Sequence, residues 1–257
     1  MRSVILLGLV CCLAPRASAQ LRAADSLYDA LKPAEALVFY QRLLARDTAS
    51  PEVLWKAGRA MVDVAKQLED DNRARQTRDS LYNLAWIYGA RSVRADSMNA
   101  NGHFVVALAL GRLSRTKGGK DRVRYGRLIY DEAALALKLP GRHDGPHHIL
   151  GAWHAEVERL SGFSRFFAKT FFGGGFLGKA SWDSAVVHLT AAVTERPDYL
   201  YHHLELAEIL VDLKRTDEAK KQLAAIERLP PTSDVLDPTY KKRAAALMLK
   251  LSRGAVP

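Results

Sequence analysis

Apolar residues recur at spacings of three and four along most of the chain, the pattern of helices that bury one face. Between residues 34 and 46, they fall at Ala36, Leu37, Tyr40, Leu43 and Leu44. The same spacing predicts a helix that begins at Pro51 and further helices over 79–95, 103–114, 121–137, 146–160, 182–195, 199–213, 216–228 and 238–251. Glycine and proline separate these segments, and runs of β-branched residues are scarce. The pattern therefore predicts an all-α chain of antiparallel helix pairs.

A small residue recurs within four of these helices, at Gly58, Gly111, Gly151 and Ala207. We expect it to let the first helix of each pair pack closely against the second. The best-defined unit, residues 181–228, is close to a tetratricopeptide consensus, although the repeat is irregular. The predicted fold is a tetratricopeptide-like right-handed superhelix of antiparallel helix pairs. It carries inserts near 67–78, 115–122 and 161–180, the last containing an apolar helix.

Several segments resemble the regulator of microtubule dynamics family and its bacterial relatives, over roughly residues 51–251. The resemblance rests on Leu54 and Trp55, on the run 148–153 and on the unit 185–220. It implies the repeat fold and offers no catalytic residues to transfer. The members named for microtubules are eukaryotic and intracellular, so an exported chain would not meet a microtubule, and we do not carry that activity over.

The first 19 residues have the features of a signal peptide. A positive charge at Arg2 precedes an apolar run over 4–14, and Ala17-Ser18-Ala19 matches an A-x-A cleavage site. We therefore expect a mature chain that begins at Gln20, forms a single helical-repeat domain over 20–257 and is periplasmic or extracellular. No other segment is apolar for the roughly 20 residues that a transmembrane helix needs, so none is expected in the mature chain.

Composition narrows the chemistry of the mature chain. Both cysteines, Cys11 and Cys12, lie in the leader, which excludes disulfides, thiol catalysis and cysteine zinc sites after cleavage. The net charge of +10 falls to +8 when Arg2 and Arg16 are removed with the leader. The excess is compatible with an anionic partner or with a solvated basic surface, and we favour the surface. We expect no nucleic-acid partner, because the basic run 112–127 has no aromatic stacking platform beyond Tyr125.

Three motifs that could carry catalysis or a cofactor lack their usual context. Residues 173–178 contain G-x-G-x-x-G, but helical sequence rather than a strand precedes it, so we interpret it as a flexible connection. His147, His148 and His154 lack the spacing of common metal sites. No serine, histidine and acid can be assembled into a triad. The sequence thus predicts no catalytic residue, no metal and no cofactor.

The concave face of such a superhelix is lined by the first helix of each pair and is the expected binding surface. Counting from the four small residues predicts a groove that is basic toward its N-terminal half and acidic toward its C-terminal half. The predicted partner-binding residues are Trp55, Arg59, Asp63, Arg112, Arg115, His148, Glu156, Glu208 and Asp212. The leading hypothesis is a non-catalytic exported scaffold that binds a protein or peptide partner there.

The phenylalanines Phe163, Phe166, Phe167 and Phe171 support an alternative hypothesis. Their helix is compatible with burial over the repeat core, which we favour, or with contact to a membrane or partner. In the alternative, the chain is a peripheral membrane or envelope-polymer-binding protein. It would use the apolar helix of 163–177 together with the basic run 112–127.

Overall fold

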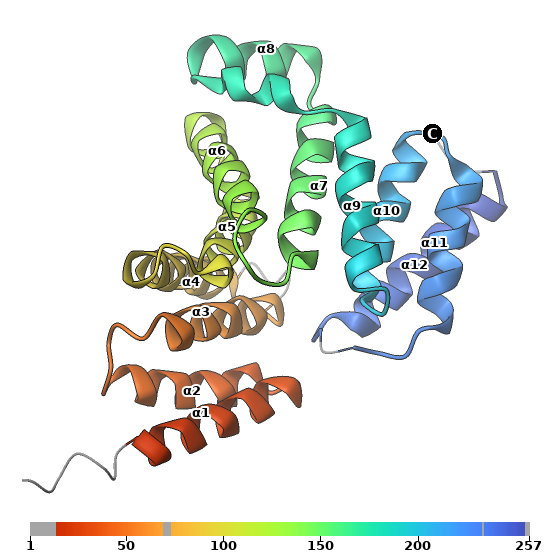
Figure 1. Cartoon of the computed structure of the whole chain (residues 1–257). Coiled ribbons are helices and arrows are strands. Elements are labelled where there is room, and N and C mark those ends of the chain that lie inside the picture. The colour runs from red at the N-terminus through yellow and green to blue at the C-terminus, as the bar shows by residue number, and fades with distance from the viewer. Residues whose placement is uncertain (1–13, 69–72, 233, 255–257) are drawn as a thin grey trace, which may run out of the picture.

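The computed structural model describes residues 14–68, 73–232 and 234–254, and within these ranges it contains helices and no strand (Figure 1). The elements are α1 Ala14–Asp29, α2 Pro33–Leu44, α3 Pro51–Lys66, α4 Arg75–Ala95, α5 Ala100–Ser114, α6 Gly119–Ala136, α7 Asp144–Glu158, α8 Gly162–Phe171, the 3-10 helix η1 Gly174–Lys179, α9 Trp182–Glu195, α10 Leu200–Asp212, α11 Thr216–Arg228 and α12 Asp237–Ser252. The all-α prediction is confirmed, and two predicted helices, 182–195 and 216–228, have the predicted ends.

Helix starts follow from local chemistry. Proline occupies the first turn of α2 and α3, where its missing N–H leaves no hydrogen bond unmade. The side chain of Asn99 caps α5 by accepting a hydrogen bond from the Gly102 N–H at 3.1 Å. Ser181 caps α9 by accepting from the Ser184 N–H at 3.1 Å. Each cap satisfies a backbone donor that the helix itself cannot pair.

The repeat is visible in two turns at opposite ends of the chain. Leu31, between α1 and α2, and Lys214, between α10 and α11, both have left-handed backbone with φ of 61° and 58°. After each, an N–H donates five residues back: Lys32 to the Leu27 carbonyl at 3.0 Å and Arg215 to that of Leu210 at 2.8 Å. This is the pattern of a Schellman helix end. The same helix–turn–helix unit therefore begins and ends the stack.

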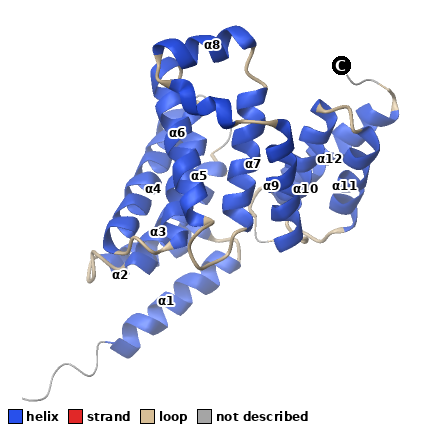
Figure 2. Ribbon diagram, turned by 45° about the horizontal axis from the view of Figure 1, so that its top comes forward, coloured by secondary structure: helices blue, strands red, loops and turns tan. Residues whose placement is uncertain are grey.

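Consecutive helices pack as pairs, and the pairs stack (Figures 1 and 2). Helix α7 pairs with α9, whereas α8 and η1, which lie between them in the sequence, stand at one end of the stack and contact α6. Two of the small residues make the expected close approaches. A Cβ on Gly151 would lie 2.6 Å from Leu189 Cγ of α9, and one on Gly58 would lie 3.1 Å from the Ala85 carbonyl of α4. Only glycine permits these approaches without displacement of the neighbouring helix.

Gly111 does not make the close packing contact that we expected. Nothing lies within 4 Å of a Cβ built at this position. The close approach of α5 to α4 falls instead at Gly102, where a Cβ would lie 2.9 Å from Ser92 Oγ. Gly111 is nine residues after Gly102, and nine residues of an α-helix make about two and a half turns. Gly111 therefore lies on the opposite side of α5 from Gly102 and faces away from α4.

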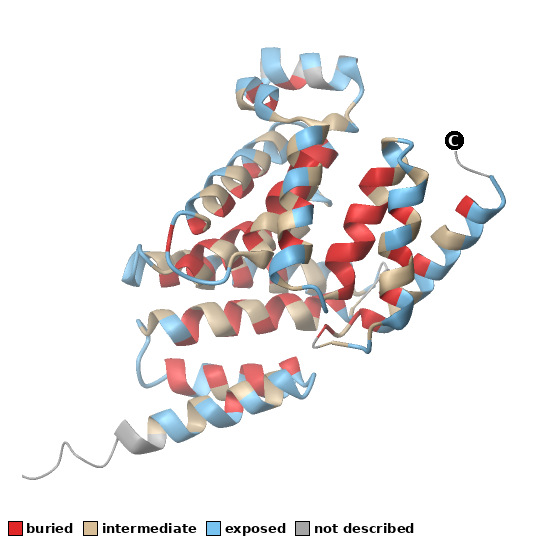
Figure 3. Ribbon diagram, turned by 45° about the vertical axis from the view of Figure 1, so that its right-hand side comes forward, coloured by how far each residue is buried: buried red, intermediate tan, exposed pale blue. Residues whose placement is uncertain are grey.

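The buried side chains form two hydrophobic cores that meet at α7. The first joins α1 to α7 with Leu177 of η1, and the second joins α9 to α12. Leu150 and Trp153 of α7 belong to the first core, and Ala155 belongs to the second. Figure 3 shows that α10 is buried along most of its length. Helix α7 is thus the shared wall between the two halves.

The glycine-rich stretch after α8 differs from the flexible connection that we predicted. Residues 174–179 form the 3-10 helix η1, in which Gly174 and Leu177 are buried. A Cβ on Gly174 would lie 2.7 Å from the Ala168 carbonyl, so this turn packs directly on α8. Phe166 of α8 is 60% exposed, whereas Ala168 of the same helix is buried in the first core.

Three of the four phenylalanines that support the alternative hypothesis, Phe163, Phe167 and Phe171, have side chains outside the described residues. The interpretation of α8 as an inserted apolar helix therefore stays a prediction. Within the described ranges, no helix is both long and apolar enough to cross a membrane.

Candidate binding cavity

A cavity of about 650 Å³ lies between α3, α5, α6, α7 and the start of α10. Its lining repeats at helical spacing. On α5, the lining residues are Phe104, Leu108, Gly111, Arg112 and Arg115, all on one face of that helix. Helices α3, α5 and α7 are the first members of their pairs, so the cavity occupies the side of the stack on which we predicted the groove.

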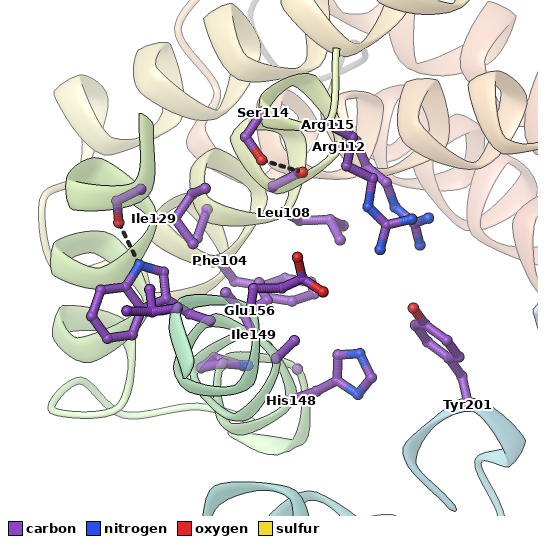
Figure 4. A pocket seen from close by; sticks show the side chains of 18 of the residues that line it. Phe104, Leu108, Arg112, Ser114, Arg115, Ile129, His148, Ile149, Glu156 and Tyr201 are labelled. Atoms are coloured by element: carbon purple, nitrogen blue, oxygen red, sulfur yellow. Dashed lines mark hydrogen bonds between the residues drawn. The ribbon is translucent and has the colours of Figure 1, made fainter. Parts of the chain in front are cut away.

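The cavity wall combines apolar and charged side chains. Phe104, Leu108 and Ile149 lie together beside α7, and Trp153 is fixed there by a 2.8 Å hydrogen bond from its Nε1 to the Gly126 carbonyl. Figure 4 shows that Arg112, Arg115, Glu156, His148 and Tyr201 point toward a common space next to these apolar side chains. A ligand in the cavity would therefore meet both apolar and charged groups.

A buried ion-pair cluster closes the cavity between the first and last repeats. Lys66 Nζ, at the end of α3, lies 2.9 Å from Asp63 Oδ1 and 2.8 Å from Oδ2 of Asp234, in the loop before α12. Tyr28 donates to Asp63, and Tyr199 donates to Asp234. Burial opposes the charge on Lys66, but the two carboxylates hold its pKa well above the ordinary value. We call Lys66, Asp63 and Asp234 the clasp.

Two histidines of the cavity wall are held neutral. Nδ1 of His148 lies 3.0 Å from Nδ1 of His202, and His202 Nε2 lies 3.3 Å from Asp144 Oδ2. Burial lowers the pKa of both rings, and the second histidine and the nearby Arg112 lower that of His148 further, whereas Asp144 partly offsets the effect on His202. A hydrogen bond between two ring nitrogens requires that one of them carry no proton, which agrees with these shifts.

The charges that line the cavity do not balance. Four acids line it: Asp63, Asp144, Glu156 and Asp234. Seven bases line it: Arg59, Lys66, Arg112, Arg115, Arg122, Arg142 and Arg196. Lys66 forms ion pairs with the two clasp acids, Asp63 and Asp234. Asp144 lies 3.5 Å from Arg142 and 3.8 Å from Arg196, and Glu156 lies 3.7 Å from Arg122.

Three arginines are left over, Arg59, Arg112 and Arg115, and none has an ion-pair partner in the described part of the chain. Arg59 lies over the ring of Tyr28 at 4.1 Å and over that of Trp55 at 5.0 Å, and its Nε is buried without a hydrogen bond. Tyrosines 201 and 240 surround Arg112; although burial opposes its charge, its pKa is raised. These three guanidinium groups remain available to an anion.

Six of the nine predicted partner-binding residues line the cavity: Arg59, Asp63, Arg112, Arg115, His148 and Glu156. Trp55 does not line it, and its ring packs against Arg59 instead. Glu208 and Asp212 also lie outside: Glu208 pairs with Arg243 at 2.7 Å and Asp212 with Arg159 at 2.6 Å. Of the three acids predicted for the C-terminal half of the groove, only Glu156 therefore lines this cavity. Glu208 is taken up by α12, which carries Arg243 and packs against α10.

The sequence reasoning missed the residues that close the cavity. Phe104 and Leu108 share the helical spacing of Arg112 and could have been found from that spacing. Lys66 likewise shares the helical spacing of Arg59 and Asp63 on α3. Tyr199 and Asp234 had no such signal. Asp234 is 168 residues from Lys66 and lies in a loop, so only the curvature of the stack brings the two together.

Three further histidines, His147, His154 and His188, form a second, separate contact. Nδ1 of His147 lies 2.9 Å from Nδ1 of His188, whose ring stacks on His154 at 5.7 Å. Burial and the two neighbouring histidines lower the pKa of His188 to about 4. In the ranges the structure covers, no group of three or more histidines, cysteines or acids is arranged to hold a metal ion.

The comparisons with known proteins agree with this architecture. A family model described as regulator of microtubule dynamics protein 1-3 matches residues 20–252. The chain belongs to the regulator of microtubule dynamics family. The resemblance inferred from the sequence is thereby confirmed.

Curated relatives in this family are distant in sequence. Regulator of microtubule dynamics protein 2 of Homo sapiens is 23% identical over 203 residues, 79% of this chain and 48% of the human protein. Regulator of microtubule dynamics protein 1 of Bos taurus is 24% identical over 153 residues, 59% of this chain and 46% of the bovine protein. The chain thus spans about half the length of the curated relatives it matches.

Among solved structures, the chain is similar to a thermophilic TPR protein of Thermus thermophilus. The TM-score is 0.64 at 22% identity, and the match covers 91% of this chain and 99% of that one. This similarity confirms the tetratricopeptide-like fold.

Proposed function

We propose that the protein is an exported, non-catalytic helical-repeat scaffold that binds a protein or peptide partner in the cavity. The observation that carries the proposal is the cavity itself, about 650 Å³ in volume and lined by α3, α5 and α7. Solenoids of this kind use the surface formed by successive first helices for binding. The cavity joins apolar side chains to unpaired arginines, a combination suited to recognition.

Binding rather than catalysis is proposed because the acids and histidines of the cavity already have partners. Each of the four lining carboxylates lies within ion-pair distance of a base, and His148 and His202 hydrogen-bond to each other. A general base needs a free acceptor next to a reacting proton. Among the charged groups of the described cavity, those left without an ion-pair partner are arginines, which together with the apolar side chains can hold a ligand.

Cleavage of the leader after Ala19 would retain the contacts of residues 24 and 25, although Ala17 also packs on the first core. Asp25 accepts hydrogen bonds from Tyr40 and Lys56, each at 2.8 Å, and Ala24 is fully buried. These residues follow the proposed cleavage site after Ala19, and the family match begins at residue 20. N-terminal sequencing of the protein from the extracytoplasmic fraction tests this: we expect Gln20, and an uncleaved chain would exclude the proposed processing.

Proximity labelling of the exported protein tests binding in the cavity. Gly111→Phe places a ring in the cavity at a position where nothing lies within 4 Å of the new Cβ, so the variant should fold. Gly162→Phe is the matched control, because its Cβ is equally unobstructed and it does not line the cavity. Partners labelled by the wild type and the control should be lost with Gly111→Phe. Their retention would exclude the cavity as the binding site.

The exposure of Phe166 favours a second candidate, peripheral attachment to a membrane through α8. Against it, Arg112, Arg115 and Arg122 of the basic run line the cavity, so they do not form one basic patch with α8. Liposome flotation separates the two functions. Co-flotation that Phe166→Ser abolishes and Gly111→Phe leaves intact would establish the second and contradict the first.

A further inference from the structure

The three unpaired arginines constrain what can occupy the cavity, provided that the cavity is the binding site proposed above. Arg112 and Arg115 are three residues apart on α5 and so lie on the same face of that helix. Figure 4 shows both guanidinium groups pointing into the space that His148 and the Tyr201 hydroxyl also face. Together with Glu156, which faces the same space, five polar groups thus converge on one part of the cavity, and two of them carry a full positive charge.

Charge complementarity requires an anion at this point. The nearest acid in Figure 4, Glu156, is already shared between Arg122 at 3.7 Å and Arg159 at 3.1 Å. The histidines cannot supply a negative charge. Burial and the neighbouring carboxylate of Glu205 raise the pKa of Tyr201 to about 12, so its hydroxyl stays protonated at neutral pH and hydrogen-bonds to Glu205. The two guanidinium groups present donors only, so they match a carboxylate, which only accepts.

The apolar surface next to these donors constrains the rest of the ligand. Phe104, Leu108 and Ile149 lie beside the arginines on α5 and α7. An apolar group of the ligand placed there would pack against these three side chains and remove them from water. The anion is therefore expected to be attached to an apolar group rather than to be a free inorganic ion.

The cavity also has polar groups along its length, which favours a peptide over an acyl chain. Asp63 and Arg59 lie at the α3 side, Asp144 lies at the start of α7, and Arg122 and Glu156 lie toward α8. An acyl chain would cover these groups without hydrogen-bonding to them, at a cost in desolvation. A peptide offers an N–H and a C=O at each residue to pair with them.

We propose that the cavity binds an acidic peptide segment. One carboxylate of the segment lies between Arg112 and Arg115, and a neighbouring apolar side chain packs on Phe104, Leu108 and Ile149. Arg59, whose buried Nε has no hydrogen-bond partner, extends the anionic preference toward α3. This is the recognition of an acidic motif by an arginine cluster within a solenoid groove.

Fluorescence anisotropy with two labelled hexapeptides tests the proposal on the full exported protein. One peptide alternates leucine and glutamate, and its matched peptide has glutamine in place of each glutamate. We expect the glutamate peptide to bind at least about tenfold more tightly, and Arg112→Gln and Arg115→Gln each to weaken it by about tenfold, as for one charge-assisted hydrogen bond. Arg94→Gln, an exposed arginine that does not line the cavity, is the control and should change nothing.

Three outcomes would overturn the proposal in different ways. Equal affinity for both peptides, with both blocked by Gly111→Phe, would remove the anionic preference and leave the proposed function standing. Binding of both peptides that Gly111→Phe does not change, or no binding of either, would overturn the cavity as a peptide site altogether. Binding of laurate that depends on Arg112 and Arg115, without such dependence for the peptides, would assign the site to a fatty-acid-like anion.

Discussion

Removal of the clasp lysine should be among the most destabilising single changes in this protein. Lys66→Met replaces a buried ammonium by an apolar side chain of similar length. It leaves two carboxylates, Asp63 and Asp234, close together without their cation, and the side chain of Asp234 is only 3% exposed. Tyr28 and Tyr199 still donate to them, but a hydroxyl compensates a buried charge less than an ammonium does.

The expected loss follows from the cost of an uncompensated buried charge. Removing one partner of a buried ion pair costs about 3–5 kcal/mol of folding free energy. With an m-value of about 3 kcal/mol/M in urea, that loss lowers the unfolding midpoint by roughly 1–1.7 M. Urea unfolding followed by circular dichroism measures it. Lys221→Met, at an exposed position of α11, serves as the matched control and should shift the midpoint by less than about 0.2 M.

The double variant Lys66→Met/Asp234→Leu distinguishes charge from packing. Removal of both charges should restore much of the stability, because a buried ion pair is often replaceable by apolar side chains at little cost. If Lys66→Met alone stays within about 1 kcal/mol of the wild type, the clasp is not a buried, coupled pair in solution. If the double variant is no more stable than the single one, the loss arises from packing, and the electrostatic reasoning is refuted.

Three further predictions concern packing, capping and pH. Gly151→Ala should destabilise the fold by about 1–3 kcal/mol, because the new Cβ would lie 2.6 Å from Leu189 Cγ. Gly111→Ala has open space for its Cβ and should stabilise the helix by about 0.5–1 kcal/mol. If the urea midpoints of both variants shifted in the same direction, the packing geometry would be contradicted. Asn99→Ala should cost about 1 kcal/mol by removing the cap of α5, and Asn99→Ser should recover most of it in the same assay. Burial lowers the pKa of histidines such as His188, so below about pH 6.5 the unfolded chain binds more protons than the folded chain. The folded state should therefore be fully stable above that pH and lose stability as the pH falls toward about 4. Equal urea midpoints at about pH 7.5 and pH 5 would exclude this dependence.

Local chemistry was sufficient for the helices. Ser181 as a cap, Pro51 in a first turn and the three- and four-residue apolar spacing each act within one or two helical turns, so the sequence alone locates the elements they govern. The prediction for residues 174–179 was wrong, because a glycine-rich run has no intrinsic structure. Its 3-10 turn forms only because Gly174 packs against the Ala168 carbonyl of α8.

The cavity was only partly predictable. Arg112, Arg115 and Glu156 line it because a helical register fixes which face of α5 or α7 turns inward. Glu208 has the same register on α10 but pairs with Arg243 of α12. Register gives the direction of a side chain and does not tell which helix will pack against it.

The amino-acid sequence by itself thus determined the class of fold, the approximate positions of most helices and the inward faces of α3, α5 and α7, since these depend on residues close together in the chain. Only the tertiary structure decided that the stack curves until Lys66 meets Asp234, and that three arginines in the enclosed cavity remain without acids. Curvature is the sum of small rotations at every helix–helix contact, including the one between α7 and α9. A contact across 168 residues is therefore set by all the packing between them and not by any local pattern.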